Sequence, residues 1–273
     1  MPASAFGLAL GAAFVHALWN LLLARARDPE AAGAVALVTG VVVFAPAAAL
    51  TWDVEREAWP YIAASSVLEL LYFALLGAAY RRAELSVVYP LSRGLAPVLV
   101  LAVGAAALGA GASPAQAAGV CLVGLGVLLV RGLRRPAAPA GVLFGLGIAA
   151  CIAAYTLVDD RGIRYSGAIA YLEMSLILPA LAYAGGLAAL KGRRALRAEL
   201  RPGALLAGVC MVGAYALVLA ALARADAAPV AAVREASVVI ATAGAALLLR
   251  EPVGPERLAG AVLVAAGVAL LGV

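Results

Sequence analysis

Long apolar runs separated by short polar or charged joints dominate the pattern along the chain. A helix needs roughly 20 apolar residues to cross the hydrocarbon core of a bilayer, so each such run predicts one crossing. An outer-membrane barrel would instead show segments of about 10 residues with alternating polarity. The pattern therefore predicts an all-α integral membrane protein with ten transmembrane helices, approximately over residues 4–24, 32–52, 60–80, 86–108, 114–131, 138–158, 166–190, 202–222, 228–249 and 257–272.

Composition agrees with this pattern and removes several function classes. Hydrophobic residues make up 66% of the 273 positions and charged residues only 13%, which is too apolar for the exterior of a water-soluble fold. The net charge of +5 comes from basic residues in the joints, so no nucleic acid partner is expected. Cys121, Cys151 and Cys210 lie inside apolar runs, where thiols behave as small apolar residues. We therefore expect no disulfide framework, no metal and no cofactor.

The second half of the chain repeats the first. A shift of 141 places residues 89–130 on 230–271 without a gap, and 13 of these 42 positions are identical. The scarcer residues carry the match, because Arg93 falls on Arg234 and Pro114 on Pro255. A fixed-period self-match of this kind indicates a duplicated unit.

The duplicated unit contains five predicted spans, the first unit covering residues 1–135 and the second 136–273. Since five is odd, the second unit must start from the opposite face of the membrane, and a pseudo-twofold axis in the membrane plane relates the halves. Two inverted five-helix repeats around a central cavity are typical of secondary transporters.

The joints also predict an orientation. Those after odd-numbered spans hold 14 basic residues and those on the other face hold four. Because Lys and Arg concentrate on the cytoplasmic side, we expect the joints after odd-numbered spans to face the cytoplasm of a multi-pass protein in the cell (inner) membrane.

Arg93 and Arg234 are the two basic residues that fall well inside predicted spans. Each follows the start of its span by about eight residues, which places it roughly 12 Å deep at 1.5 Å per residue. A charge at that depth costs about 2.5–3.5 kcal/mol on insertion scales. Two interpretations remain open: a structural ion pair, for instance of Arg93 with Glu69, or a binding site for a carboxylate or phosphate, which the planar guanidinium can hold with two hydrogen bonds.

Pro90 and Pro97 lie on either side of Arg93 in the fourth span. Each proline removes a backbone donor and frees a carbonyl one turn earlier, which is tolerated at membrane depth where protein or water satisfies it. This predicts a bent or broken helix beside a cavity.

Three carboxylates lie inside spans: Glu69, Glu173 and Glu235. One hypothesis is that Glu69 or Glu173 exchanges protons and couples transport to a proton gradient. The alternative is that each carboxylate neutralises an arginine. Adjacent helical residues point about 100° apart, so Arg234 and Glu235 are not expected to point together into one narrow cavity.

Aromatic side chains with polar tips suit a cavity that holds an amphipathic metabolite. His16, Trp19 and Asn20 form an i, i+3, i+4 cluster on the first span, in which we interpret His16 as a packing residue. Depth and chemistry together nominate the following substrate-binding residues: Trp19, Tyr72, Tyr89, Arg93, Tyr155, Tyr215 and Arg234.

Small residues recur in "GVCLVGLG" at 119–126 and "GAVLVAAG" at 260–267. Such spacing allows close contact between membrane helices. We expect packing along the fifth and tenth spans, either within one protomer or between the two protomers of a homodimer.

Several stretches together resemble the drug/metabolite transporter superfamily, in particular its ten-span EamA-type branch. They are "HALWN" in the first span, "VVYPLSRGLAPVLVLAVGAAALG" in the fourth, and "AAVREASVVIATAGAALLLREPVGPERLAGAVLVAAGVALLGV" across the last two. The resemblance implies two inverted bundles enclosing a cavity, and cargo drawn from small metabolites such as amino acids, purines, sugars and phosphorylated compounds. The first unit departs from the family in "LGAGASP", where a glutamate is common.

These features favour a secondary transporter that exports a small polar or amphipathic metabolite by alternating access, with proton coupling as a hypothesis and with the bilayer and the metabolite as its partners. The chain lacks "GxxxxGK[ST]", which excludes a self-contained ATP-driven pump. A lipid-headgroup flippase and an intramembrane lipid-modifying enzyme remain alternatives. Against the enzyme, the chain has no "GxSxG" or "HExxH".

Overall fold

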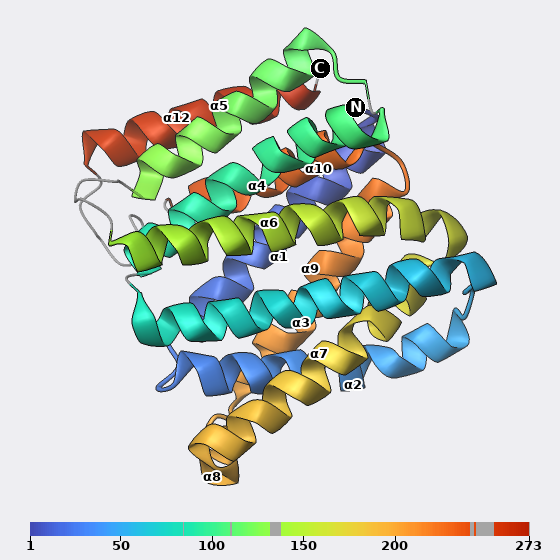
Figure 1. Cartoon of the computed structure of the whole chain (residues 1–273), viewed down its shortest axis with the longest axis vertical. Helices are drawn as coiled ribbons and strands as arrows, with labels where there is room; N and C mark the ends of the chain where they lie inside the picture. The colour runs from blue at the N-terminus through green and yellow to red at the C-terminus, as the bar shows by residue number, and fades with distance from the viewer. Residues whose placement is uncertain (84, 110, 132–137, 241–242, 244–253, 273) are drawn as a thin grey trace.

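The protein is built from α-helices that lie roughly side by side (Figure 1). A computed structural model describes residues 1–83, 85–109, 111–131, 138–240, 243 and 254–272. Within these residues there is no β-strand, and an isolated bridge joins Val54 to Ser166. The helices are α1 (Ala3–Ala24), α2 (Pro29–Leu50), α3 (Trp59–Arg82), α4 (Leu85–Leu108), α5 (Pro114–Arg131), α6 (Pro139–Gly162), α7 (Ala168–Lys191), α8 (Arg193–Ala198), α9 (Pro202–Leu222), α10 (Ala227–Arg234) and α12 (Pro255–Gly272), with short 3-10 turns η1 (Arg56–Ala58) and η2 (Ile163–Tyr165).

Proline and glycine set many of the helix boundaries. Helices α2, α5, α6, α9 and α12 all begin at a proline, whose fixed φ suits the first helical position and whose missing N–H would have no partner there. Helix α7 ends before Gly192, which has φ 82°, a conformation that glycine adopts without steric cost.

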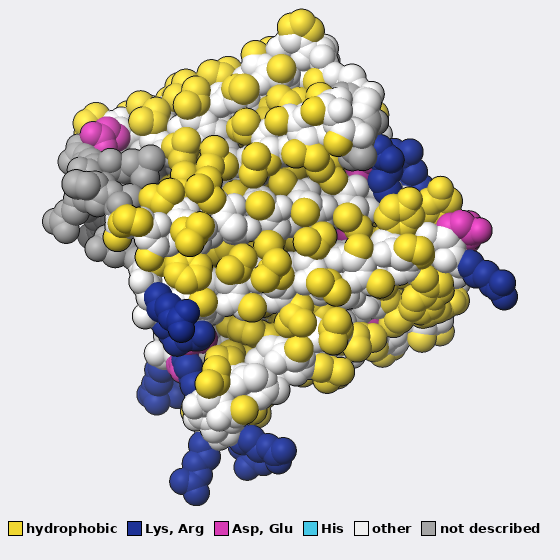
Figure 2. All heavy atoms as spheres, in the orientation of Figure 1, with side chains coloured by type: hydrophobic (Ala, Val, Ile, Leu, Met, Phe, Trp, Pro, Cys, Tyr) yellow, Lys and Arg dark blue, Asp and Glu magenta, His cyan; other side chains and the backbone are white. Residues whose placement is uncertain are grey.

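Eight of the described helices, α1, α2, α3, α4, α6, α7, α9 and α12, are long and apolar enough to cross a membrane, and the described part of α5 is a shorter apolar helix. Hydrophobic side chains cover the middle of the molecule in Figure 2, while Lys and Arg gather near the helix ends. Leu143 and Leu190 are each 73% exposed, as expected for side chains that face lipid. The predicted ninth span, 228–249, is described only up to residue 240 and at residue 243.

The two halves of the chain interleave. Helix α1 packs along α9, α3 packs along α6, and α5 packs along α12, so each of these pairs joins a helix of the first half to one of the second (Figure 1). Helix α10 lies against both α4 and α1. The interior between the halves is therefore lined by helices from both.

Glycines bring α5 and α12 into close contact. A Cβ added to Gly126 would lie 2.7 Å from the carbonyl oxygen of Gly260, and one added to Gly267 would lie 2.6 Å from that of Gly119. Such separations leave no room for a side chain. The predicted packing role of these glycines is confirmed, and the contact lies within one protomer.

The helix break expected at the prolines lies in the second half instead. Helix α4 continues from Leu85 to Leu108 through both Pro90 and Pro97. Helix α10, in contrast, ends at Arg234, Glu235 forms a turn, and helix resumes over residues 236–240. The expectation of a bent or broken fourth span was wrong as to a break, because Pro97 only removes one hydrogen bond while the turns on either side continue. The break gives Arg234 and Glu235 different directions.

Candidate functional site

A cavity of about 340 Å³ lies in the interior, with walls from α1, α2, α3, α4, α6, α7, α9 and α10. All seven residues nominated for substrate binding line it, namely Trp19, Tyr72, Tyr89, Arg93, Tyr155, Tyr215 and Arg234. Glu69 lines it as well, whereas Glu173 and Glu235 lie outside the lining. The volume is at the lower end of the range of about 300–1,000 Å³ for small-molecule sites.

The Arg93 guanidinium is held by neighbours on two other helical segments. Its Nη1 lies 3.4 Å from Oε1 of Glu235, and its Nη2 contacts Nε2 of His16. The Tyr89 ring centroid lies 5.8 Å from Cζ. An arginine only donates, so His16 accepts at Nε2 and carries its proton on Nδ1. The ion-pair interpretation of Arg93 gave Glu69 as an example of a partner, and the carboxylate that lies beside it is that of Glu235.

Arg234 has different surroundings. It is 5% exposed, and its Nε has no hydrogen-bond partner within the described part of the chain. The Tyr215 ring centroid lies 6.0 Å from its Cζ, and the Tyr155 phenol interacts with the guanidinium. Among the residues that the structure describes, no carboxylate forms an ion pair with Arg234.

Three of the cavity tyrosines form a continuous aromatic wall. The rings of Tyr72 and Tyr155 are 6.2 Å apart and nearly perpendicular, and those of Tyr155 and Tyr215 are 5.8 Å apart. On α1, the rings of His16 and Trp19 meet edge to face at 4.8 Å. Apolar ring faces and phenol tips are thus both available to a bound molecule.

A further buried acid, Asp159, was not found from the sequence. Asp159 is fully buried near the end of α6 and accepts hydrogen bonds from Tyr171, at 2.9 Å, and from the cavity residue Tyr215. The predicted sixth span ended at residue 158, so this aspartate was placed in a joint. Helix α6 continues through the segment "TLVDDRG" to Gly162, so extending the predicted sixth span over this segment would have placed Asp159 on the helix.

Of the predicted carboxylates, Glu69 faces the cavity from α3, and Glu173 is 3% exposed on α7 with Oε2 lacking a hydrogen-bond partner. Ser66 of α3 donates to the carbonyl oxygen of Ser175 at 2.9 Å, which ties these two helices together nearby. The described residues contain no group of His, Cys, Asp and Glu suited to a metal ion.

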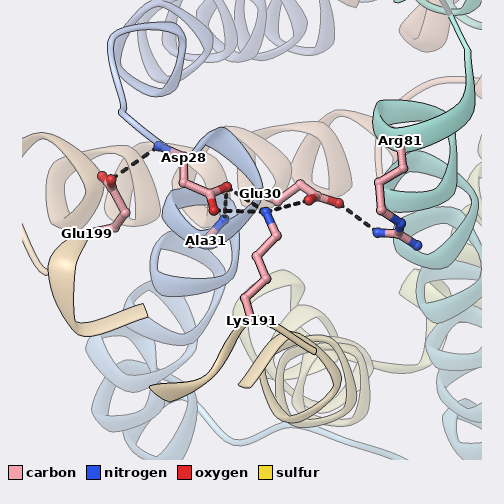
Figure 3. A network of polar contacts seen from close by, with 6 residues as sticks. All are labelled: Asp28, Glu30, Ala31, Arg81, Lys191 and Glu199. Atoms are coloured by element: carbon pink, nitrogen blue, oxygen red, sulfur yellow. Dashed lines mark hydrogen bonds and ion pairs between the residues drawn. The ribbon is translucent and has the colours of Figure 1, made fainter. Parts of the chain in front are cut away.

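One end of the cavity reaches the joint between α1 and α2. Its lining there includes Leu23, Ala24, Pro29 and Glu30. Figure 3 shows the polar network at this rim, in which Glu30 pairs with Arg81 of α3 at 2.9 Å and with Lys191 of α7 at 2.6 Å.

The same network extends to Asp28, which lies 2.8 Å from Lys191 Nζ and accepts from the Ala31 N–H at 3.2 Å as the N-cap of α2. Partial burial acts to raise the pKa of Asp28, but the hydrogen bonds from Lys191 and Ala31 outweigh it and the pKa is lowered. Glu199, after α8, accepts from the Asp28 N–H at 3.2 Å. The network therefore joins three carboxylates and two basic side chains at the rim.

The opposite end is packed. Tyr171 is fully buried there, the rings of Tyr61 and Tyr165 stack at 6.1 Å, and the Val54–Ser166 bridge joins the two loops. These residues do not line the cavity. The cavity thus extends toward the end that carries the 25–28 and 191–201 joints.

Comparison with known proteins places the chain in a family. A model of the EamA-like transporter family matches residues 3–132 and again 139–273. A search of curated protein sequences gave no match. Among solved structures, one crystal structure aligns over 97% of this chain and 94% of its own, with a TM-score of 0.76 and 20% sequence identity. At that identity the likeness extends to the fold alone.

Proposed function

Because the chain belongs to the EamA-like transporter family, we propose that it is a secondary transporter that carries a small polar or amphipathic metabolite across the cell membrane by alternating access. The observation that carries this proposal is the interior cavity, which holds two arginines and a wall of tyrosines between helices of both halves and extends toward one end only. The family is one of transporters rather than enzymes.

The packing pattern supports two inverted five-helix repeats, residues 1–135 and 136–273, as the moving parts. In such a repeat, α1 and α2 of the first half correspond to α6 and α7 of the second, and α3 corresponds to α9. The contact of α1 with α9 then has its counterpart in the contact of α6 with α3, and the contact of α2 with α9 has its counterpart in that of α7 with α3. All four contacts are present. A structure that maps onto itself in this way can present the same cavity to either side by rocking one set of helices against the other.

The basic joints support export as the proposed direction of transport. The rim of the cavity lies at the end that carries Arg25, Arg81 and Lys191, which the distribution of Lys and Arg assigns to the cytoplasm. A cavity that loads from the cytoplasm fits an exporter. Glu69, the one predicted coupling residue in the lining, is the candidate for proton coupling.

The test begins with thermal stabilisation of the purified protein by a panel of metabolites, since a ligand of the folded state raises its apparent stability. Each stabilising compound is then tested for saturable exchange in proteoliposomes. Arg93→Lys keeps a positive charge opposite Glu235 but loses the planar fork, and we expect slower exchange, with exposed Arg224→Lys as the matched control. Absence of saturable exchange for every stabilising compound would reject the transporter proposal.

Proton coupling has a separate test. In proteoliposomes with an imposed pH gradient, the wild type is expected to accumulate substrate and Glu69→Gln only to equilibrate it. Accumulation by Glu69→Gln equal to that of the wild type would remove Glu69 from the coupling step.

A further inference from the structure

We infer that Arg234 is the residue that binds a single anionic group of the transported molecule, and that this molecule is a small carboxylate with an aromatic or apolar body. The inference rests on the proposed transport function and names the substrate class of the same cavity. Arg93, although it lines the cavity too, acts as a positioning residue whose charge is already matched.

The case against Arg93 as the anion site is that its charge is matched by Glu235 and that both of its terminal nitrogens already have a partner. Glu235 is 1% exposed and lies 3.4 Å from Nη1, while His16 accepts a hydrogen bond from Nη2 at Nε2. A ligand carboxylate at Arg93 would have to approach the buried charge of Glu235, and like charges at such a distance repel strongly in a low-dielectric interior.

Arg234 carries a buried charge that forms no ion pair with a carboxylate among the residues that the structure describes. Its side chain comes from the last residue of α10, directly before the turn at Glu235, and lines the cavity. The guanidinium is buried, its Nε has no hydrogen-bond partner among the described residues, and the ring of Tyr215 and the phenol of Tyr155 lie beside it. A buried charge is expected to be paired, and a planar guanidinium is well suited to pairing with a carboxylate through two parallel hydrogen bonds.

The nearby acids do not supply that pairing. Asp159 is occupied by the phenols of Tyr171 and Tyr215. Glu30 is held at the rim by Lys191 and Arg81. Glu69 shares the cavity but forms no ion pair with Arg234 in the described structure.

The rest of the lining describes the body of the ligand. Tyr155 and Tyr215 both lie beside Arg234 and form part of the aromatic wall. A carboxylate placed on the guanidinium would therefore put its attached carbon skeleton against ring faces. The cavity volume of about 340 Å³ favours a molecule at the small end of the range for pocket ligands.

The experiment compares carboxylates with their uncharged isosteres on the full chain in detergent. The probes are benzoate, phenylacetate, 3-phenylpropionate and 4-methylpentanoate, each paired with its primary amide, and dissociation constants are taken from thermal stabilisation against probe concentration. At least one carboxylate is expected to bind tenfold or more tightly than its amide. In Arg234→Gln the carboxylate should fall to the level of the amide while the amide is unchanged, and in exposed Arg224→Gln both should match the wild type.

Two results would overturn the inference: a panel in which no carboxylate binds better than its amide, or a preference for the carboxylate that survives in Arg234→Gln. Binding of the amide, which Arg234→Gln must retain, shows that this variant is folded. Arg234→Lys is a second variant for the same measurement: it keeps the charge and should retain part of the preference for the carboxylate over the amide. If the carboxylate binds through Arg234 but is not exchanged by proteoliposomes, the transporter proposal fails and the anion site stands. If an amide is exchanged as fast as its carboxylate, the anion site fails and the transporter stands.

Discussion

Removing the charge of Glu235 tests whether the Arg93–Glu235 pair holds the interior together. The two side chains are 8% and 1% exposed, with Nη1 and Oε1 3.4 Å apart. At an effective dielectric constant of about 20, two unit charges at this distance attract by about 5 kcal/mol. Deleting one partner of a buried pair typically costs about 3–5 kcal/mol, because the other charge is left unpaired.

Glu235→Gln keeps the size of the side chain and removes only the charge. We expect a loss of about 3 kcal/mol in the free energy of unfolding, which corresponds to a fall of about 6–12 °C in the melting temperature at roughly 2–4 °C per kcal/mol. The measurement is thermal unfolding of the purified protein in detergent, followed by tryptophan fluorescence. Exposed Glu57→Gln is the matched control and should melt with the wild type.

The double variant Arg93→Gln/Glu235→Gln completes a thermodynamic cycle. With both charges gone, neither partner of this pair is left as an unpaired buried ion, and the double variant is expected to recover most of the stability lost by Glu235→Gln. If Glu235→Gln melts with the wild type, or the double variant is as unstable as the sum of both single variants, the pair does not stabilise the interior and the reasoning is refuted.

Three further predictions concern other parts of the molecule. Gly126→Ala would place a Cβ 2.7 Å from the Gly260 oxygen and should lower the free energy of unfolding by about 1–3 kcal/mol, as measured by thermal unfolding. The control is Gly185→Ala, whose Cβ would have nothing within 4 Å and which should leave the free energy of unfolding unchanged. Folding lowers the pKa of Asp28, so its ion pair stabilises the fold above the unfolded pKa of about 3.9 and this stabilisation is lost as the pH falls through the folded pKa. Asp28→Asn should therefore make the melting temperature less dependent on pH between pH 5 and pH 3. A curve parallel to that of the wild type would contradict this. Asp159→Leu removes the acceptor of the hydrogen bonds from the buried Tyr171 and from Tyr215 and should cost about 1–3 kcal/mol, which equal melting temperatures would disprove.

Hydrophobic periodicity predicted the helices well because bilayer thickness determines how long an apolar run must be. The first predicted span, 4–24, corresponds to α1 at Ala3–Ala24, and the eighth, 202–222, has the bounds of α9. The positions of Arg93 and Arg234 in the cavity could also be predicted from the sequence, since a charge in the middle of an apolar run has to point toward the protein interior. That these side chains bind substrate stays a prediction.

Partnerships between helices could not be predicted in the same way. Glu235 was expected to neutralise an arginine or to serve in coupling, but its contact with Arg93 joins residues 142 positions apart (235 − 93) and depends on a turn that no proline marks. His16 was interpreted as a packing residue, yet it contacts Arg93 from α1. Asp159 was missed because span boundaries are the least reliable part of a sequence prediction. Each of these depends on packing between helices rather than on local pattern.

The interleaving of the two halves separates membrane insertion from folding in time. Helix α1 ends at Ala24, but its principal partner α9 begins at Pro202, so the ribosome must add most of the chain before α1 can dock. Until then the early helices persist in the bilayer as individually stable spans, as helices in lipid can, with the polar groups of His16 and Asn20 not yet enclosed. A polypeptide truncated after the first half would present those groups to lipid, which makes it a substrate for membrane quality control rather than a functional half-transporter.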